Sequence, residues 1–373
     1  MANKINHLID AFQRLTQQAE NCVLATIIET FSSTYQKAGA RMLITTEGEL
    51  IGLLGGGCFE RDLVEQALTV FESGSPKSIF YDMRSSDDII WGLGLGCNGA
   101  VRVFLQLLKA EDNFAPLNKL IDAAENNAHC IMVTVVDSEH HQFPAGYTLF
   151  VPTFTTNNRQ LLSSAPFPFT NAALQTIEKQ KPHIESHVIN SQTIKAFYEP
   201  IHPPLRLLIL GAGADAIPLT QFAKLLGWRI TVVDHRPGYI IKDRFPNADQ
   251  LLYRTPDTIH DDLAINQFNA LIVMTHNIEY DQRYLKAIVN CEIPFVGLLG
   301  PVHRKIKLLQ SLGNDASKIS SRVFGPVGLN IGAETPEEIA LSIMAGIHAE
   351  LNKCDGLQLN GKCQNHLYEN VQR

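Results

Sequence analysis

Two cysteines stand in glycine-rich turns in the first third of the chain. Cys58 follows three glycines at 55–57, and Cys97 lies within Gly94-Leu95-Gly96-Cys97-Asn98-Gly99. Successive glycines are typical of turns in which the backbone takes a positive φ or approaches another group closely. A thiol in such a turn has few neighbouring side chains to bury it. It can therefore remain open to a ligand, a sulfur donor or a metal.

The residues after Cys58 predict a helix, since apolar side chains recur at helical spacing from Phe59 to Phe71. A helix N-terminus lowers the pKa of a nearby thiol and favours the thiolate. Glu60 and Asp62, in the first turn, oppose that effect. The two cysteines are far apart in sequence and have no histidine beside them, which does not fit a closed zinc site, so no metal is predicted. For each cysteine alone, the alternative is a small residue chosen to fit a tight turn.

A second glycine-rich turn follows the apolar run Leu205–Leu210. Gly211-Ala212-Gly213-Ala214-Asp215-Ala216 fits the pattern G-x-G-x-x-G/A, in which the backbone approaches a pyrophosphate at a helix N-terminus. Asp234 ends the next predicted strand, where a carboxylate binds the ribose hydroxyls of a dinucleotide. Arg236 could instead bind a 2′-phosphate, so the sequence is compatible with either NAD or NADP as the nucleotide. The alternative is a Rossmann-like domain that packs well and holds no nucleotide.

A dehydrogenase would also need a placed acid or base. The candidate for this acid or base is the segment Thr275-His276-Asn277, at the end of a later predicted strand. Thr275 is predicted to contact the nucleotide. A solvated or hydrogen-bonded histidine is the alternative for His276.

The order of elements predicts an α/β protein of two domains. Residues 1–201 read as a mixed α/β domain, and His202-Pro203-Pro204 then interrupts regular structure. Strands and helices alternate from there to residue 353, which predicts a Rossmann-like parallel-sheet domain over 202–353. Within it, Thr335-Pro336-Glu337-Glu338 has the sequence of a capping box. Residues 354–373 read as a polar tail.

Composition narrows the classes of function. The chain has 373 residues, 45% of them hydrophobic and 18% charged, with a net charge of −7. This balance disfavours nucleic acid and anionic membrane as partners, because both need basic patches. No apolar run approaches the roughly 20 residues of a membrane span, and the first twenty residues predict an amphipathic helix rather than a signal peptide. We therefore expect a cytoplasmic protein.

Seven cysteines without a CxxC pair are expected to be thiols in that compartment. Cys22, Cys130 and Cys291 lie in or beside apolar runs and are predicted to be buried.

The two halves together resemble the XdhC/CoxI family, the xanthine dehydrogenase accessory factors. In the first half the resemblance is carried by Ala38-Gly39-Ala40-Arg41-Met42, by the stretch from Gly52 to Glu60 and by that from Trp91 to Gly99. In the second half it is carried by 211–218, 233–237, 297–300 and 325–343. The chain departs from the family pattern at Phe59, where leucine is usual, and at Asp215, where many members carry histidine.

The resemblance implies a chaperone that binds molybdenum cofactor (molybdopterin), supports its sulfuration with a cysteine desulfurase, and delivers it to a xanthine dehydrogenase-type enzyme. It implies that Cys58, Glu60, Cys97 and Asn98 lie at that cofactor. Gly211, Gly213, Asp234, Arg236 and Thr275 would line a nucleotide site, for the cofactor's own nucleotide or for NAD(P). The rival interpretations are an NAD(P)-dependent oxidoreductase of unknown small-molecule substrate and a pure protein–protein adaptor. The sequence leaves the oligomeric state open, a homodimer included.

Overall fold

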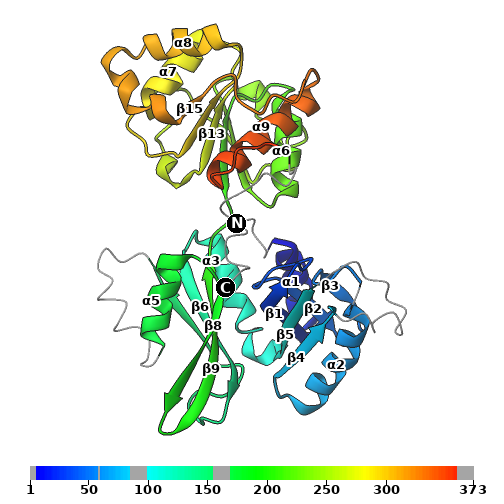
Figure 1. Cartoon of the computed structure of the whole chain (residues 1–373). Coiled ribbons are helices and arrows are strands. Elements are labelled where there is room, and N and C mark those ends of the chain that lie inside the picture. The colour runs from blue at the N-terminus through cyan, green and yellow to red at the C-terminus, as the bar shows by residue number, and fades with distance from the viewer. Residues whose placement is uncertain (1–5, 58, 85–98, 154–168, 359–373) are drawn as a thin grey trace. The chain divides into compact units, whose positions relative to one another are not determined.

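The chain divides into two units that meet at the Pro203–Pro204 bond. The structure is a computed structural model and describes residues 6–57, 59–84, 99–153 and 169–358 (Figure 1). Each unit is built around its own sheets and cores, and each is described by itself.

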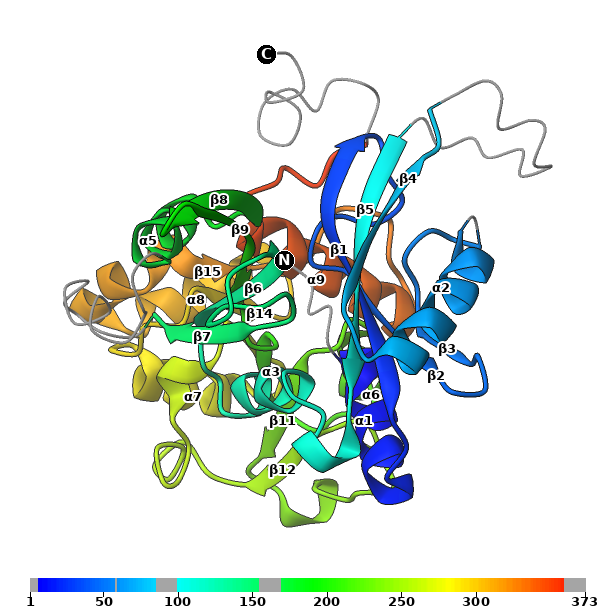
Figure 2. The same cartoon turned by 90° about the horizontal axis from the view of Figure 1, so that it is seen from below.

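The first unit contains a five-stranded antiparallel sheet with the strand order β3-β2-β1-β5-β4. Its strands are β1 (Cys22–Ser32), β2 (Arg41–Thr45), β3 (Leu50–Gly52), β4 (Lys77–Asp82) and β5 (Gly99–Leu108). β1 is the central strand and is buried over most of its length, so its side chains face apolar layers on both sides. Figure 2 shows β1, β5 and β4 side by side, with α2 (Glu60–Ser73) beside them.

Alternate residues of β1 supply the two cores of this sheet. Cys22 and Leu24 pack with α1 (Asn6–Gln18) and α3 (Leu117–Glu125). Val23 and Ala25, on the opposite face, pack with the buried side of α2. The apolar run of β1 is thus explained by helices on both faces of the strand.

A second antiparallel sheet in this unit has the order β7-β6-β9-β8. Its strands are β6 (Cys130–Ser138), β7 (Thr148–Pro152), β8 (His183–Ile189) and β9 (Gln192–Ile201), and α5 (Thr170–Lys179) packs on it. A buried ion pair between Arg41 of β2 and Glu199 of β9 joins the two sheets.

The second unit holds a parallel sheet with the order β12-β11-β10-β13-β14-β15. Its strands are β10 (Arg206–Leu210), β11 (Arg229–Asp234), β12 (Gln250–Tyr253), β13 (Ala270–Val273), β14 (Phe295–Leu298) and β15 (Val323–Phe324). Its helices are α6 (Ala216–Leu225), α7 (Ile278–Ile288), α8 (Val302–Gln310) and α9 (Pro336–Leu351). α6 and α9 cover one face and α7 and α8 the other (Figure 1). The predicted fold class, mixed α/β followed by a Rossmann-like parallel sheet, is confirmed.

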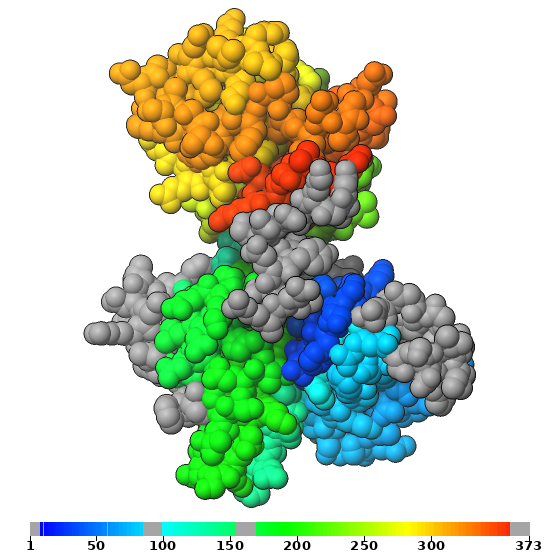
Figure 3. Space-filling model, in the orientation of Figure 1, coloured from blue at the N-terminus to red at the C-terminus, as the bar shows by residue number. Residues whose placement is uncertain are grey.

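The last helix begins where the sequence predicts. Thr335 accepts a hydrogen bond from the N–H of Glu338, and the Glu338 carboxylate accepts one of 3.0 Å from the N–H of Thr335. This capping box fixes the start of α9, part of which lies at the surface of its unit (Figure 3).

Candidate functional site

A buried carboxylate organises the first glycine turn. Glu60, the first residue of α2, accepts hydrogen bonds from the N–H groups of Gly55 at 2.5 Å, Gly57 at 3.0 Å and Phe59 at 3.2 Å. Gly56 and Gly57 have φ values of +68° and +98°, a conformation that side chains with a Cβ rarely adopt. A Cβ on Gly55 would lie 2.3 Å from the ring of Phe59, so all three positions require glycine.

The second cysteine-bearing segment rejoins the sheet close to this turn. Phe59 stacks on Tyr81 of β4, with 4.7 Å between ring centroids. Tyr81 pairs with Val101 of β5, two residues after Gly99. The N–H of Met83 donates to the carbonyl of Gly99 at 3.0 Å. Phe59, the residue after Cys58, thus packs against the end of the sheet at which Gly99, two residues after Cys97, begins β5.

A short segment after β1 contacts both turns. A Cβ on Gly99 would lie 2.2 Å from the carbonyl oxygen of Ser33, so only glycine fits there. The ring of Tyr35 lies 3.7 Å from the position of a Cβ on Gly56, and most of this ring is exposed. The structure therefore brings the flanks of the two glycine turns together around residues 33–35.

Three predicted site residues, Cys58, Cys97 and Asn98, lie outside the residues that the structure describes, and their role stays a prediction. Glu60 is described, and its observed contacts are with backbone N–H groups. The carboxylate of Glu60 thus lies at the start of α2, where the sequence predicts that it opposes the effect of the helix N-terminus on a Cys58 thiolate.

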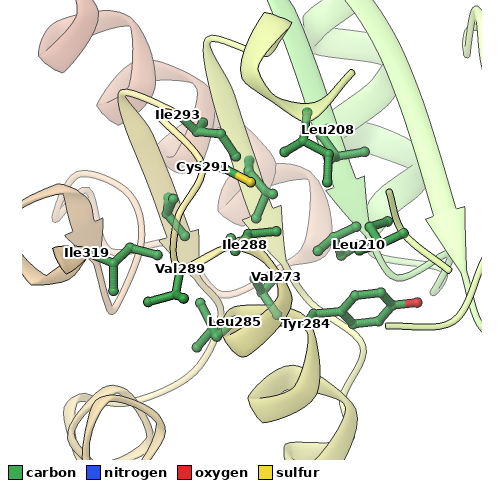
Figure 4. Close-up of a cluster of buried hydrophobic side chains, with 14 of the residues drawn as sticks. Leu208, Leu210, Val273, Tyr284, Leu285, Ile288, Val289, Cys291, Ile293 and Ile319 are labelled. Atoms are coloured by element: carbon green, nitrogen blue, oxygen red, sulfur yellow. The ribbon is translucent and has the colours of Figure 1, made fainter. Parts of the chain in front are cut away.

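The cysteines in apolar runs are buried, as predicted. Burial raises the pKa of Cys22 to about 12 and that of Cys130 to about 11, with Glu20 and Glu199 adding to the respective effects. Burial also raises the pKa of Cys291, which Figure 4 shows among aliphatic side chains such as Ile288 and Ile293. These three thiols are therefore protonated and unreactive at neutral pH. Cys354 is exposed.

The glycine turn of the second unit is shaped by close contacts with its own chain. Gly211 has a φ of +125°, and a Cβ there would lie 2.3 Å from the carbonyl oxygen of Met274. A Cβ on Gly213 would lie 2.4 Å from a carboxylate oxygen of Asp215. That carboxylate therefore lies close to the backbone of Gly213, at the start of α6.

Asp234 is buried and bound within its own unit. It accepts hydrogen bonds from the N–H of Ala212 at 2.7 Å and from the N–H of Arg236 at 2.8 Å, and it forms an ion pair with the Arg236 guanidinium. Burial disfavours the charged carboxylate, but these hydrogen bonds outweigh that cost and hold the pKa of Asp234 below its usual value. The Arg236 guanidinium also lies over the ring of Tyr239, 3.6 Å from its centroid. Contact with a ribose or a 2′-phosphate would require these groups to exchange partners.

Thr275 is buried, and its hydroxyl donates to Asp281 at 2.5 Å. His276 is more exposed, has a φ of +59°, and its Nε2 lies 2.7 Å from Oδ2 of Asp215. Asp215 and His276 follow β10 and β13, which are neighbours at the point where the strand order reverses. Ligands of open α/β sheets bind at this point, outside the carboxyl ends of the strands.

Among the described residues, no group of three or more His, Cys, Asp or Glu side chains is placed to hold a metal ion. In the same part of the chain, no helix is both long enough and apolar enough to cross a membrane.

Comparison with known proteins places the chain in a family. Residues 15–82 match the XdhC and CoxI family, and residues 207–347 match the XdhC Rossmann domain. The chain is 33% identical to a probable xanthine dehydrogenase subunit from Bacillus subtilis (strain 168), over 89% of this chain and 94% of that protein. The chain belongs to the XdhC and CoxI family.

Two further similarities cover nearly the whole chain. The chain is 31% identical to the molybdenum cofactor insertion chaperone PaoD of Escherichia coli (strain K12), over 90% of this chain and 86% of that protein. A crystal structure described as a xanthine dehydrogenase from Bacillus halodurans superposes with a TM-score of 0.73 at 29% identity, covering 94% of this chain and 96% of that one. The resemblance seen in the sequence motifs is thereby confirmed.

Sequence reasoning missed several residues around the two turns. Tyr35 and Tyr81 are single aromatic residues without a motif, and nothing in the sequence relates them to Gly56 or Phe59. The role of Glu60 had a local signal, because an acid three residues after Gly57 can reach back to the N–H groups that precede a helix. Asp215 lies at the Gly211 turn of the second unit. Its sequence signal was that many family members carry histidine at this position.

Proposed function

We propose that this protein is an accessory chaperone of a molybdenum-containing dehydrogenase of the xanthine dehydrogenase type. In this proposal it binds molybdenum cofactor and delivers it to the enzyme. The observation that carries the proposal is that Gly56, two residues before Cys58, and Gly99, two residues after Cys97, both lie against residues 33–35. Family membership and the similarity to PaoD, which is named as an insertion chaperone, support the same function.

The described residues fit a ligand of this kind. Glu60 holds the first turn in one conformation, so the chain flanking Cys58 is pre-organised before a ligand arrives. Tyr35 offers an exposed ring beside Gly56, and aromatic faces pack well against planar heterocycles. The bound cofactor would supply molybdenum with its dithiolene and pterin. Cys58 and Cys97 would supply sulfur ligands.

The proposal includes a cysteine desulfurase as the source of the sulfido sulfur and a dehydrogenase of this type as the recipient. Both partners follow from the family resemblance.

The test measures molybdenum and the fluorescent pterin oxidation product that co-purify with the chain. Cys58→Ala and Cys97→Ala are each expected to hold much less of both, with unchanged thermal unfolding. The small effect on stability is expected because a thiol in an open turn lacks the packing whose loss costs about 2–5 kcal/mol in a core. Cys354→Ala, which removes an exposed thiol of the second unit, is the matched control and should hold as much cofactor as the parent. Parent levels of cofactor in both turn variants would contradict the proposed ligand site.

A second candidate function, an NAD(P)-dependent oxidoreductase, is favoured by the Asp215–His276 pair. An exposed imidazole held by a carboxylate at the carboxyl end of a parallel sheet could act as an acid or a base. This function predicts steady oxidation of NADH or NADPH with a carbonyl or disulfide acceptor, and loss of that activity in His276→Gln. Absence of turnover in the parent protein would exclude it.

A further inference from the structure

A pocket of about 560 Å³ lies within the second unit, apart from the turn at Gly211. It is lined by three segments: 299–301 after β14, 326–333 before α9, and Ile339 with Ser342 on α9 itself. A pocket of this size falls in the range of roughly 300–1,000 Å³ typical of small-molecule sites. Because β14 ends at Leu298, the pocket lies at the carboxyl edge of the sheet, where ligands of open α/β sheets bind.

The walls of this pocket are held by contacts within the unit. The N–H of Val327 donates to the carbonyl of Leu298 at 3.2 Å, which attaches the 326–333 segment to β14. The Ser342 hydroxyl donates to the carbonyl of Leu329 at 2.6 Å, and the N–H of Leu329 donates back to the carbonyl of Ser342 at 3.1 Å. Gly328 has a φ of +113°, and a Cβ there would lie 2.3 Å from the Ser342 oxygen. The pocket is therefore formed before any ligand binds.

The lining residues carry no ionisable side chain. Most of the walls are aliphatic or proline side chains, and the polar side chains are those of Asn330 and Ser342. The backbone N–H groups of residues 330–333 have no acceptor within the described part of the chain, so they are free to donate to water or to a ligand. At the start of α9, Glu338 already accepts from Glu334 and Thr335.

This chemistry selects against a charged group and for a neutral planar one. A phosphate or carboxylate against these aliphatic walls would be poorly solvated, because Arg304, whose side chain packs on Gly300, is already paired with Asp281 at 2.6 Å. A flat, neutral nitrogen heterocycle packs its faces on apolar side chains and satisfies its edge with N–H groups and an amide. We propose that the pocket binds a neutral fused bicyclic nitrogen heterocycle, the class that includes pterins and purines.

The two members of this class have different sources. A pterin bound here would be separate from the molybdenum cofactor, because the dithiolene sulfurs that bind molybdenum are carried by the cofactor's own pterin system, which the proposed function places in the first unit. A purine would be the base of a nucleotide, and that reading is independent of molybdenum.

The experiment titrates the full-length protein with neopterin, a neutral fluorescent pterin, and separately with guanosine and adenosine. Saturable binding of at least one is expected. Ile331→Asp places a charge in the lining and Ala333→Trp fills the space, and each should weaken binding about tenfold or more, equivalent to about 1.4 kcal/mol. Leu341→Asp is the matched control: Leu341 is 47% exposed and Ile331 is 50% exposed, but Leu341 does not line the pocket. It should bind as the parent does.

Each result decides one part of the inference. Binding of neopterin alone assigns the pocket to a pterin, and binding of a nucleoside alone assigns it to a purine. No binding of any probe at millimolar concentration, or equal weakening by Ile331→Asp and Leu341→Asp, overturns the inference. Molybdenum cofactor content is measured on the same proteins. If the parent binds neopterin here but never holds molybdenum cofactor, the proposed function fails and the pocket stands. If Ile331→Asp weakens neopterin binding and leaves the cofactor content unchanged, the pocket and the proposed cofactor site are separate, as inferred. If Ile331→Asp lowers the cofactor content as much as Cys58→Ala does, the pocket holds the cofactor's own pterin and the inference of a separate site is overturned.

Discussion

The carboxylate of Glu60 accepts a hydrogen bond of 3.0 Å from the N–H of Gly57, the residue before Cys58. The same carboxylate binds the N–H of Phe59, the residue after it. One buried acid thus fixes the backbone on both sides of the cysteine and places a negative charge at the start of α2. The turn is pre-organised at the expense of the positive potential that a helix N-terminus would otherwise present there.

Glu60→Gln should destabilise the first unit and reduce the amount of cofactor held. The amide keeps one acceptor oxygen but turns an NH2 group toward backbone N–H groups, which leaves at least one buried donor without a partner. The expected loss in the free energy of unfolding is about 1–3 kcal/mol, measured by urea denaturation alongside bound pterin. Glu65→Gln, at an exposed position of the same helix, should change stability by less than about 0.5 kcal/mol. Equal stabilities of the two variants would show that Glu60 does not organise the turn.

The buried pair Arg41–Glu199 is expected to matter far more than a surface pair. Glu199→Gln would leave the Arg41 guanidinium buried beside a neutral amide, and removal of one partner of a buried pair costs about 3–5 kcal/mol. The comparison is Glu29→Gln, which breaks the half-exposed pair with Arg102 and should cost less than about 1 kcal/mol. Chemical denaturation of both variants measures the difference. Similar losses would mean that the connection between the two sheets does not depend on this pair.

The lowered pKa of Asp234 predicts that the folded chain loses stability in acid. Its pKa is lower in the folded chain than in the unfolded chain, because Arg236 and the N–H of Ala212 favour the carboxylate despite its burial. The stabilisation is therefore fully present above the unfolded value of about 4 and is lost as the pH falls through the lower folded value. Asp234→Asn should lower the free energy of unfolding by about 1.5–3 kcal/mol at neutral pH. Between about pH 5 and pH 2 the stability of this variant should fall less than that of the parent, because it has no carboxylate to protonate at this position. Urea midpoints across that range measure this, and parallel curves for the two proteins would contradict it.

Sequence reasoning succeeded where the interacting groups are close in the chain. The Thr335–Glu338 capping box spans four residues and was predictable from residue types alone. Alternating strands and helices also predicted the parallel sheet. The strand β8 carries no such signal, because its sequence HIESHVI mixes charged and apolar residues on an edge of its sheet.

Contacts between distant residues were not predictable. Arg41 and Glu199 are 158 positions apart, and neither stands in a motif that names the other. Likewise, the glycines at 55–57 and Gly99 suggest two separate turns, and only the fold shows that residues 33–35 touch both. For Asp234 the sequence predicted the position at the end of β11. It did not predict that Arg236 and the N–H of Ala212 donate hydrogen bonds to this carboxylate, because these bonds depend on how the Gly211 turn folds against the strand.

The last prediction concerns Asp215 and decides whether the Gly211 turn binds nucleotide. Its carboxylate lies at the N-terminus of α6 and next to the backbone of Gly213, the place where a pyrophosphate would approach. A bound phosphate would meet that like charge, while the other oxygen of the same carboxylate lies 2.7 Å from Nε2 of His276. Asp215→Asn removes the repulsion, and an expected gain of about 1 kcal/mol corresponds to roughly fivefold tighter binding.

Calorimetric titration with NAD, NADP and ATP measures this effect in the parent, in Asp215→Asn and in Asp243→Asn. Asp243 is an exposed acid of the same unit, so its variant matches the change in net charge and should bind as the parent does. Tighter binding by Asp215→Asn alone would assign the phosphates to the Gly211 turn. Equal gains in both variants would reflect net charge rather than this site. If none of the three nucleotides binds any of the proteins at millimolar concentration, the prediction of a nucleotide at this turn is wrong. Gly211 and Gly213 would then be required only because the turn packs closely against Met274 and Asp215.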